Sequence, residues 1–181
     1  MPEKKESERK LLRLSEISLQ LDTYDDIFSD FDARPYSNRA LSDDFLIESK
    51  KASKDKPSGG IELKFLMPTR ERNSQNEILI KKRLHEHFTK HYIILKEEVI
   101  NLKKKGIIMA LAGVFMIFIA TYLFSINQSW PIKFLEVLLE PAGWFTAWTG
   151  LEDIYYTGRE LKRNLDFYEK MSKAEINFLS Y

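Results

Sequence analysis

The sequence of 181 residues contains no cysteine, no apolar leader at its N-terminus and almost no net charge, which is +1 at neutral pH. Without cysteine the chain can build neither a disulfide framework nor a thiolate metal site. The small net charge gives no sign of a nucleic-acid groove, so we expect no nucleic-acid partner. Because the first ten residues are mostly charged and lack the apolar core of a signal peptide, we expect the N-terminus on the cytoplasmic side.

Catalytic signatures are also missing. The sequence has no nucleophile–base constellation, no phosphate-binding loop and no cofactor fingerprint, so we predict that the protein is not an enzyme and carries no cofactor. His87 and His91 are four residues apart and could share a helix face, as helical zinc ligands do. No carboxylate completes an H-E-x-x-H frame around them, so we interpret these two and His85 as a solvated or intersubunit helix face.

One long stretch without charge is present. Residues 106–124 carry no charged side chain and are long enough to cross a hydrocarbon core of ~30 Å as a helix. A short polar turn at residues 125–131 leads to a second hydrophobic segment, residues 131–156. Eight lysines and arginines lie in residues 81–105 and five in residues 157–173, so the positive-inside rule places both termini in the cytoplasm. We expect an integral membrane protein with two passes, located in a bacterial inner membrane.

The residues before these segments predict a small cytoplasmic α+β module, residues 1–72, with two short strands. Apolar and polar side chains alternate at residues 14–21 and again at 61–67, as they do in half-buried strands. Between them, Ser42 is placed to cap a short helix over residues 43–53, whose first turn is acidic. Two strands alone do not make a stable sheet, so we expect them to pair against a helix or with neighbouring subunits.

A long amphipathic helix is predicted to join this module to the membrane. It begins at a capping box formed by Ser74 and Glu77, and it covers residues 73–105 without glycine or proline. After the second hydrophobic segment, residues 157–181 predict a basic amphipathic helix in the cytoplasm. The sequence thus predicts a mainly α membrane protein, with a two-helix transmembrane hairpin over residues 106–156, a stalk helix and the small α+β module.

A segment rich in aspartate and aromatic residues follows the first predicted strand. Its carboxylates suggest calcium, but residues 22–44 place no glycine at the sharp turn of an EF-hand loop and no glutamate at its end. We therefore interpret the segment as a docking surface for a cytoplasmic protein partner, or as a turn-rich packing segment. The residues assigned to the docking surface are Asp25, Asp26, Phe28, Asp30, Phe31 and Tyr36.

Two carboxylates lie inside the second hydrophobic segment. Glu136 and Glu140 are one helical turn apart and project from the same face. Lys133 could pair with Glu136 at the outer boundary, whereas Glu140 has no such partner in the sequence. Pro141 removes a backbone donor and frees the carbonyl group of Val137, so two sources of oxygen converge near Glu140. Oxygen ligands suit hard cations, and we predict that a divalent or monovalent cation binds at Glu140.

This string of residues resembles a known family. The stretch Leu138-Leu-Glu-Pro-Ala-Gly-Trp-Phe145 looks like the start of the second transmembrane helix in the mitochondrial calcium uniporter family, whose signature is Trp-Asp-x-x-Glu-Pro followed by an aromatic pair. Glu140 and Pro141 match its Glu-Pro pair, and Trp144 with the following residue matches its aromatics. The resemblance implies a cation-conducting pore to which Glu140, Pro141 and Trp144 belong.

The chain also departs from the family pattern. Val137 stands at the position of the family's aspartate, and Leu135 and Glu136 stand where its tryptophan would be. One of the family's two acidic rings is therefore absent here or has moved to Glu136. The surroundings of the motif resemble the family as well, with a long helix before the first membrane segment, a short outer turn and a charged helix after the second, and the resemblance covers about 50 of the 181 residues.

Two hypotheses follow. In the first, the protein is a homo-oligomer whose second membrane helices form a ring of acids, with Glu140 facing the ions and Glu136 in an outer vestibule, because acidic rings select cations. In the second, the hairpin anchors an assembly or effector protein that recruits a cytoplasmic partner and conducts nothing. Glu140 would then be protonated or bonded to a neighbouring helix, for example through Thr121 or Tyr122.

Overall fold

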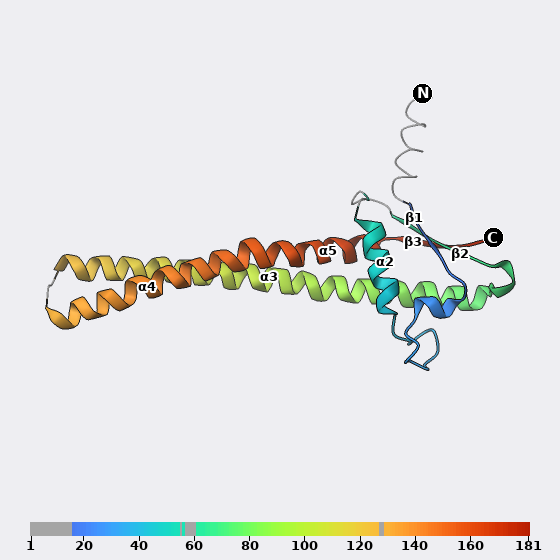
Figure 1. Ribbon diagram of the computed structural model, residues 1–181, viewed down its shortest axis with the longest axis horizontal. Coiled ribbons are helices and arrows are strands. Elements are labelled where there is room, and N and C mark those ends of the chain that lie inside the picture. Colours follow the sequence, from blue (N-terminus) through green and yellow to red (C-terminus); the bar gives the residue numbers. More distant parts are fainter. Residues whose placement is uncertain (1–15, 55, 57–60, 127–128) are drawn as a thin grey trace, which may run out of the picture. The chain divides into compact units, whose positions relative to one another are not determined.

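The computed structural model describes residues 16–54, 56, 61–126 and 129–181. The chain is mainly helical with one small sheet, and it forms two compact units. We call Met1–Ile93 together with Leu165–Tyr181 the sheet unit, and Ile94–Asn164 the hairpin unit. Two helices, α3 (Ser74–Ile126) and α5 (Gly158–Ser172), begin in one unit and end in the other (Figure 1).

Three parallel strands form the sheet, in the order β1 (Glu16–Gln20), β2 (Glu62–Met67) and β3 (Glu175–Ser180). The register aligns Leu19 of β1 with Phe65 of β2. Both strands that alternation predicts in the N-terminal module are confirmed, and they pair directly with each other.

The third strand corrects the prediction of a helix over residues 157–181. α5 ends at Ser172, and β3 begins three residues later. Ile176 and Phe178 are buried and the residues beside them are less so, which is the period of a strand and not of a helix. The sequence predicted two strands, whereas the sheet has three. The third strand, β3, pairs with β2 and comes from residues after the helices.

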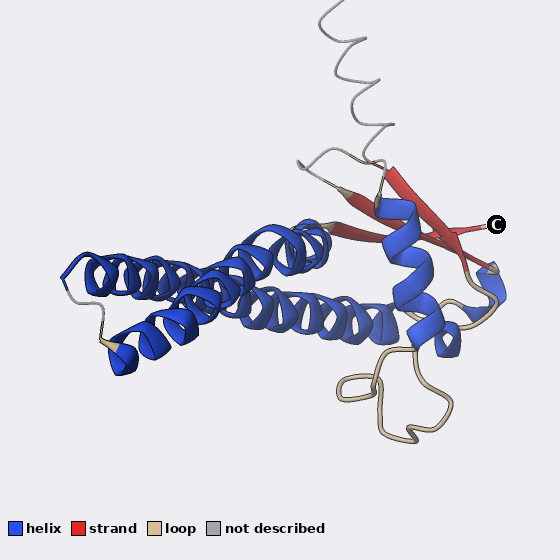
Figure 2. Cartoon of the chain, turned by 60° about the vertical axis from the view of Figure 1, so that its left-hand side comes forward, coloured by secondary structure: helices blue, strands red, loops and turns tan. Residues whose placement is uncertain are grey.

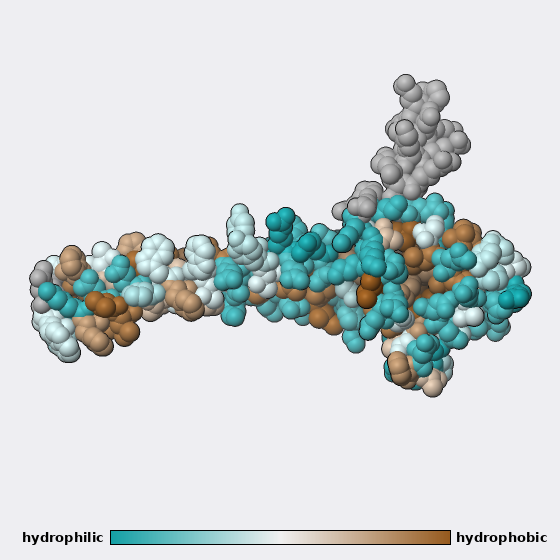
Figure 3. Space-filling view, in the orientation of Figure 1, coloured by the Kyte–Doolittle hydropathy of each residue, from teal (hydrophilic) through white to brown (hydrophobic). Residues whose placement is uncertain are grey.

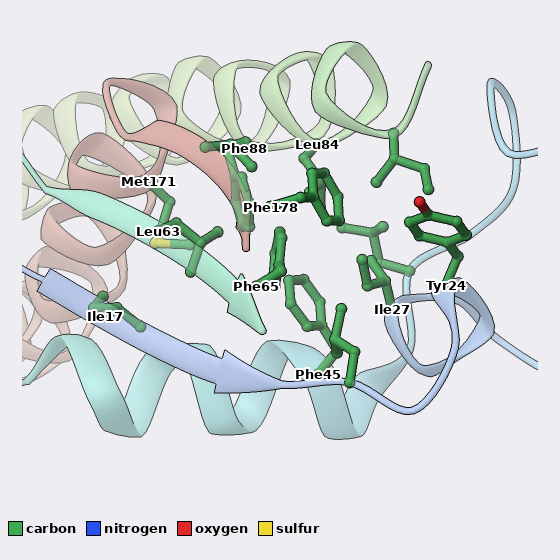
Figure 4. Close-up of a cluster of buried hydrophobic side chains, with 14 of the residues drawn as sticks. Ile17, Tyr24, Ile27, Phe45, Leu63, Phe65, Leu84, Phe88, Met171 and Phe178 are labelled. Carbon is green, nitrogen blue, oxygen red and sulfur yellow. The ribbon is translucent and has the colours of Figure 1, made fainter. Parts of the chain in front are cut away.

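The core of the sheet unit is built on alternate residues of the central strand. Leu63, Phe65 and Met67 of β2 are fully buried, and the residues between them are half-buried. The rings of Phe45 and Phe178 lie against Phe65, with centroid distances of 5.9 and 5.1 Å (Figure 4). Helices α3 and α5 complete the core with Ile80, Leu84, Phe88, Phe167 and Met171.

Short helices follow β1 and β2 in the sheet unit. The helix α2 spans Asp43–Ser53, the range that the sequence predicts, and Ser42 before it is extended. Two 3-10 turns, η1 (Tyr24–Ile27) and η2 (Thr69–Glu71), follow β1 and β2. These elements connect the strands and bring Phe45 and Tyr24 into the core.

The start of α3 differs from the predicted capping box. The side-chain oxygen of Asn73, and not that of Ser74, accepts hydrogen bonds from two backbone N–H groups of the first turn, at 2.9 and 3.2 Å. The Glu77 carboxylate instead accepts bonds from Arg72 Nε at 2.8 Å and from the Tyr24 hydroxyl at 3.2 Å. The Arg72 guanidinium keeps the pKa of Glu77 below its usual value, so this buried acid stays ionised.

The helices of the hairpin unit follow one another with little interruption. α3 continues through Lys105 without a break, so the predicted stalk and the first hydrophobic segment are one helix. α4 spans Trp130–Glu152, and a π-helical turn, η3 (Asp153–Thr157), leads directly into α5. Among the described helices, α3 is the one that is long and apolar enough to cross a membrane, over Ser74–Ser125.

The helices also form the connection between two neighbouring strands. The chain leaves β2, passes through α3, α4 and α5, and returns to pair β3 with that same β2 (Figures 1 and 2). The strand before these helices and the strand after them are therefore hydrogen-bonded to each other in one sheet.

Candidate functional site in the hairpin unit

α3 and α4 pack against each other through glycine and alanine. A Cβ atom added at Gly113 of α3 would lie 2.5 Å from the carbonyl oxygen of Gly143 on α4. One added at Gly150 of α4 would lie 2.5 Å from the carbonyl oxygen of Gly106 on α3. No side chain fits at such distances, so glycine is required at these positions for the backbones to come this close.

The two helices contribute the same spacing of small residues to this seam. Gly106, Ala110 and Gly113 follow one another at intervals of four and three on α3, and Gly143, Ala147 and Gly150 repeat those intervals on α4. We call these six residues the small-residue seam. The seam was not predicted from the sequence. Comparing the two hydrophobic segments for equal spacing would have found the seam.

The large apolar side chains of the hairpin unit point away from the seam. Within the single chain, Phe115, Phe118 and Phe145 are 65%, 69% and 76% exposed. Hydrophobic residues show at the surface of this unit in the space-filling view (Figure 3). Other members of this outward set are Ile107, Ile108, Leu111, Val114, Ile119, Phe124, Phe134, Leu135, Leu138 and Leu151. An apolar surface of this extent needs a cover other than water.

Two acids of α4, Glu136 and Glu140, differ in exposure. Glu136 is half-buried; it lies seven residues before Gly143, as Glu140 lies seven residues before Ala147, so both belong to the helix face that carries the seam. Glu140 is exposed. In the described part of the chain it has no hydrogen-bond or ion-pair partner, and no ion pair joins Lys133 to Glu136. The acid that lacked a partner in the sequence also lacks one in the described structure.

The residues around Glu140 are mostly apolar and exposed. Val137 is 70% exposed and Trp144 is 62% exposed, on the turns before and after it. Pro141 lies inside α4, which continues through it, so the Val137 carbonyl loses its usual helical donor. Thr121 of α3 does not reach Glu140, because its hydroxyl donates to the Ile117 carbonyl of its own helix at 2.9 Å.

The other end of the hairpin is held by charges and by the π-helical turn. Lys105 Nζ lies 3.7 Å from an oxygen of the Asp153 carboxylate, a distance that fits an ion pair and is too long for a good hydrogen bond. Gly150 and Gly158 are buried on this stretch and Ile154 between them is half-buried, at two successive steps of four. A π-helical turn holds one residue more than an α-helical turn, and η3 therefore accommodates this spacing. Gly150, Ile154 and Gly158 thus stay on one side of the chain as it enters α5.

The aspartate-aromatic segment is largely used by the sheet unit itself. Asp26 accepts hydrogen bonds from the backbone N–H groups of Asp22 and Thr23 at 2.7 and 3.0 Å. Phe28 is buried in the core and stacks on Tyr36, whose hydroxyl donates to Asp25. These contacts agree with a turn-rich packing segment.

Two residues of the predicted docking surface remain fully available. Asp30 is exposed, and the Phe31 side chain is 101% exposed at the loop tip. The neighbouring Asp32 is tied down by Arg34 and by the backbone N–H of Ala40. The loop thus presents an aromatic ring to solvent from a fixed backbone.

The histidine prediction needs correction for two of the three residues. His85 is exposed, but His87 and His91 pack against Tyr168 of α5 inside the sheet unit, with His91 stacked on its ring at 5.2 Å. Burial lowers the pKa of His87 to about 4, and the nearby positive charges of Arg83 and Lys90 add to the effect. Burial also lowers the pKa of His91. They form an internal contact and no solvated face.

Comparisons of the chain with protein-family models, with curated proteins and with solved structures find no match. Within the described residues, no group of three or more histidine, cysteine, aspartate or glutamate side chains is arranged to hold a metal ion.

Proposed function

We propose that the protein crosses a membrane twice, through the apolar half of α3 and through α4. The pairing of β2 with β3 supports this proposal, because two strands of one sheet lie on one side of a membrane. The connection between them must therefore cross an even number of times. If α3 crosses, α4 is the described helix available for the return. The carboxylates of Glu136 and Glu140 in the middle of its apolar stretch explain why hydropathy alone does not identify α4 as a membrane span.

The charges at the ends of the hairpin support cytoplasmic termini. Lys103, Lys104 and Lys105 end the stalk, and Arg159, Lys162 and Arg163 follow the return helix. The turn between the helices has Lys133 as its nearest cation. This asymmetry is the one that the positive-inside rule associates with a hairpin whose ends are both in the cytoplasm.

Within this arrangement we propose a homo-oligomeric cation pore. The small-residue seam occupies the contact between α3 and α4, and Glu140 lies on the exposed surface. A carboxylate facing lipid at membrane depth costs several kcal/mol, about 2.5–3.5 by insertion measurements. Assembly of several copies around a water-filled path removes this cost, because the ring of Glu140 side chains then faces water and cations. The exposure of Glu140 on an apolar surface is the observation that carries the proposal.

The ring offers oxygen ligands to a cation. Each copy supplies the Glu140 carboxylate and the Val137 carbonyl that Pro141 leaves without a donor. Glu136 forms an outer vestibule one turn away, and Trp144 lines the path one turn deeper. No resident metal is needed, because the cation is the substance transported.

Flux through liposomes tests the pore. We expect vesicles that contain the wild-type protein to pass cations, and Glu140→Gln to reduce the flux about tenfold or more, because the ring loses its charge. The matched control is Glu152→Gln, which removes the same charge from an exposed residue at the end of α4 and should leave the flux near wild type. A mass measurement checks that both variants form the wild-type oligomer.

Two results would refute the pore. The first is that vesicles containing the wild-type protein pass no cations at any voltage, pH or ion gradient applied. The second is an equal loss of flux in Glu140→Gln and Glu152→Gln, which would show a general charge effect and no role for the ring.

A second function, that of a membrane anchor which recruits a cytoplasmic protein, is favoured by one observation. Phe31 is a fully exposed aromatic side chain on a loop that Asp32 holds in place, with the Asp30 carboxylate beside it. Such a ring contributes nothing to the fold and suits a partner's pocket. Tight wild-type vesicles, with no effect of Glu140→Gln on assembly, would favour this function over the pore.

A further inference from the structure

A basic hollow lies just after the return helix. It has a volume of about 410 Å³ and lies within the hairpin unit, at the junction of η3 and α5. Arg159 and Arg163 are one helical turn apart along its wall, and Tyr156 and Thr157 add hydroxyl groups. Glu160 also lines it, so two guanidinium groups face one carboxylate in the hollow.

The two arginines of the hollow differ from the other described arginines. Arg34, Arg39, Arg70, Arg72 and Arg83 each bond a carboxylate or a carbonyl oxygen of the chain. In the part of the chain that the structure describes, neither Arg159 nor Arg163 has a hydrogen-bond or ion-pair partner. Their guanidinium groups are therefore free to bind an anion from outside the chain.

We infer that this hollow binds the phosphate of an anionic lipid headgroup on the cytoplasmic leaflet. The inference rests on the proposed membrane hairpin, which puts the junction after α4 at the level of the headgroups. Guanidinium groups match phosphate oxygens in paired hydrogen bonds, and the attraction to an anionic leaflet adds to them. The exposed rings of Tyr155 and Tyr156 flank the arginines and suit the same interfacial layer.

Native mass spectrometry of the purified full-length protein tests the inference. The protein in neutral detergent is titrated with phosphatidylglycerol or with phosphatidylcholine, and the bound lipid is counted. We expect preferential binding of phosphatidylglycerol, weakened about fivefold per arginine and so about twenty-fivefold in the double variant Arg159→Gln/Arg163→Gln. The matched control is Lys103→Gln/Lys104→Gln, which removes two exposed charges from the same side but outside the hollow.

The outcomes separate the alternatives. Retention of binding in the lysine variant and loss in the arginine variant supports the site, whereas equal loss in both shows diffuse attraction and overturns it. Displacement of the lipid by millimolar inorganic phosphate would show a site for free phosphate and would also overturn it. Equal binding of both lipids by the wild-type protein overturns it as well.

A separate measurement distinguishes failure of the headgroup site from failure of the membrane hairpin. The chain has no cysteine, so Ser74→Cys and Ser129→Cys each carry a single reactive thiol. In sealed vesicles a membrane-impermeant reagent should label these two sites from opposite sides. Labelling of both sites from one side refutes the hairpin itself, while opposite labelling with no lipid preference refutes the headgroup site alone.

Discussion

The sheet unit and the hairpin unit bury opposite kinds of residues. In the sheet unit the large side chains of Phe28, Phe65 and Phe88 are inside, and Glu77, which Arg72 pairs, is a buried charge among them. In the hairpin unit the glycines and alanines of the small-residue seam are inside, and the phenylalanines of α3 and α4 are outside. Each pattern suits a different solvent, because water drives large apolar groups inward, whereas helices in lipid gain most from close backbone contact.

The difference also separates what stabilises each unit. The sheet unit depends on burial of apolar area, as in any water-soluble domain. The hairpin unit depends on how closely two backbones can approach, which its glycines control. All three tryptophans, Trp130, Trp144 and Trp148, lie on α4, so tryptophan fluorescence reports on the hairpin unit alone. The two units can therefore be followed separately in one sample.

The largest expected effect comes from removing a buried ring. We expect Phe65→Ala to lower the free energy of unfolding of the sheet unit by about 3–5 kcal/mol, because it leaves a cavity at the centre of the core. Phe118→Ala, the same change on the outside of the hairpin unit, should alter stability by no more than about 0.5 kcal/mol. Chemical denaturation in detergent, followed by circular dichroism, gives both values. Equal losses would contradict the contrast between the units.

A smaller effect is expected from filling the seam. Gly113→Leu places a side chain where even a Cβ has no room, so we expect it to separate the helices and destabilise the hairpin unit by about 1–3 kcal/mol. Ala112→Leu is its control, because Ala112 is the next residue on α3 and is exposed. Titration with a denaturing detergent, followed by tryptophan emission, measures both. If the two variants unfold at the same detergent concentration, the seam does not hold the hairpin.

The smallest expected effect is a pH dependence of stability that the sheet unit shows and the hairpin unit does not. The pKa of His87 is about 4 in the folded state and about 6.5 in the unfolded state, so only the unfolded chain takes up the proton between these values. The stability of the sheet unit should therefore be full above pH 6.5 and fall by about 1–2 kcal/mol on acidification to pH 5. Tryptophan emission from the hairpin unit should stay constant over this range.

Two variants check the assignment of this pH dependence. His87→Leu should reduce the slope between pH 7 and pH 5 and leave the contribution of His91, whose pKa burial also lowers. His85→Leu should keep the slope, because His85 is exposed. A slope that survives in His87→Leu and disappears in His85→Leu would place the titration outside the contact with Tyr168.

The elements with a clear local pattern could be predicted from the sequence. The alternation at β1 and β2 and the acidic first turn of α2 determine those elements locally, and the structure gives them at the expected places. β3 was missed because its six residues follow a basic helix and gain their strand conformation only by pairing with β2. The cap of α3 was misplaced because Glu77 bonds Arg72 and Tyr24 instead, and Tyr24 is 53 residues away in the sequence.

The candidate site was predicted in part, for a physical reason. The contrast between Glu136 and Glu140 follows from spacing and charge, and the structure gives the two residues different exposures. The small-residue seam requires knowledge of which residues of two segments face each other. The hollow with Arg159 and Arg163 depends on the π-helical turn before it, for which the sequence has no evident local signal.

The pairing of β3 with β2 fixes an order of events during synthesis. β2 is made before α3, but its second neighbour, β3, is made only after α3, α4 and α5. The central strand thus keeps an open edge while both hydrophobic helices emerge, and the core stays without Ile176 and Phe178 until the hairpin is complete. A chain whose synthesis stalled after α4 would carry an unfinished sheet, and the open edge of β2 would be available for pairing with another chain.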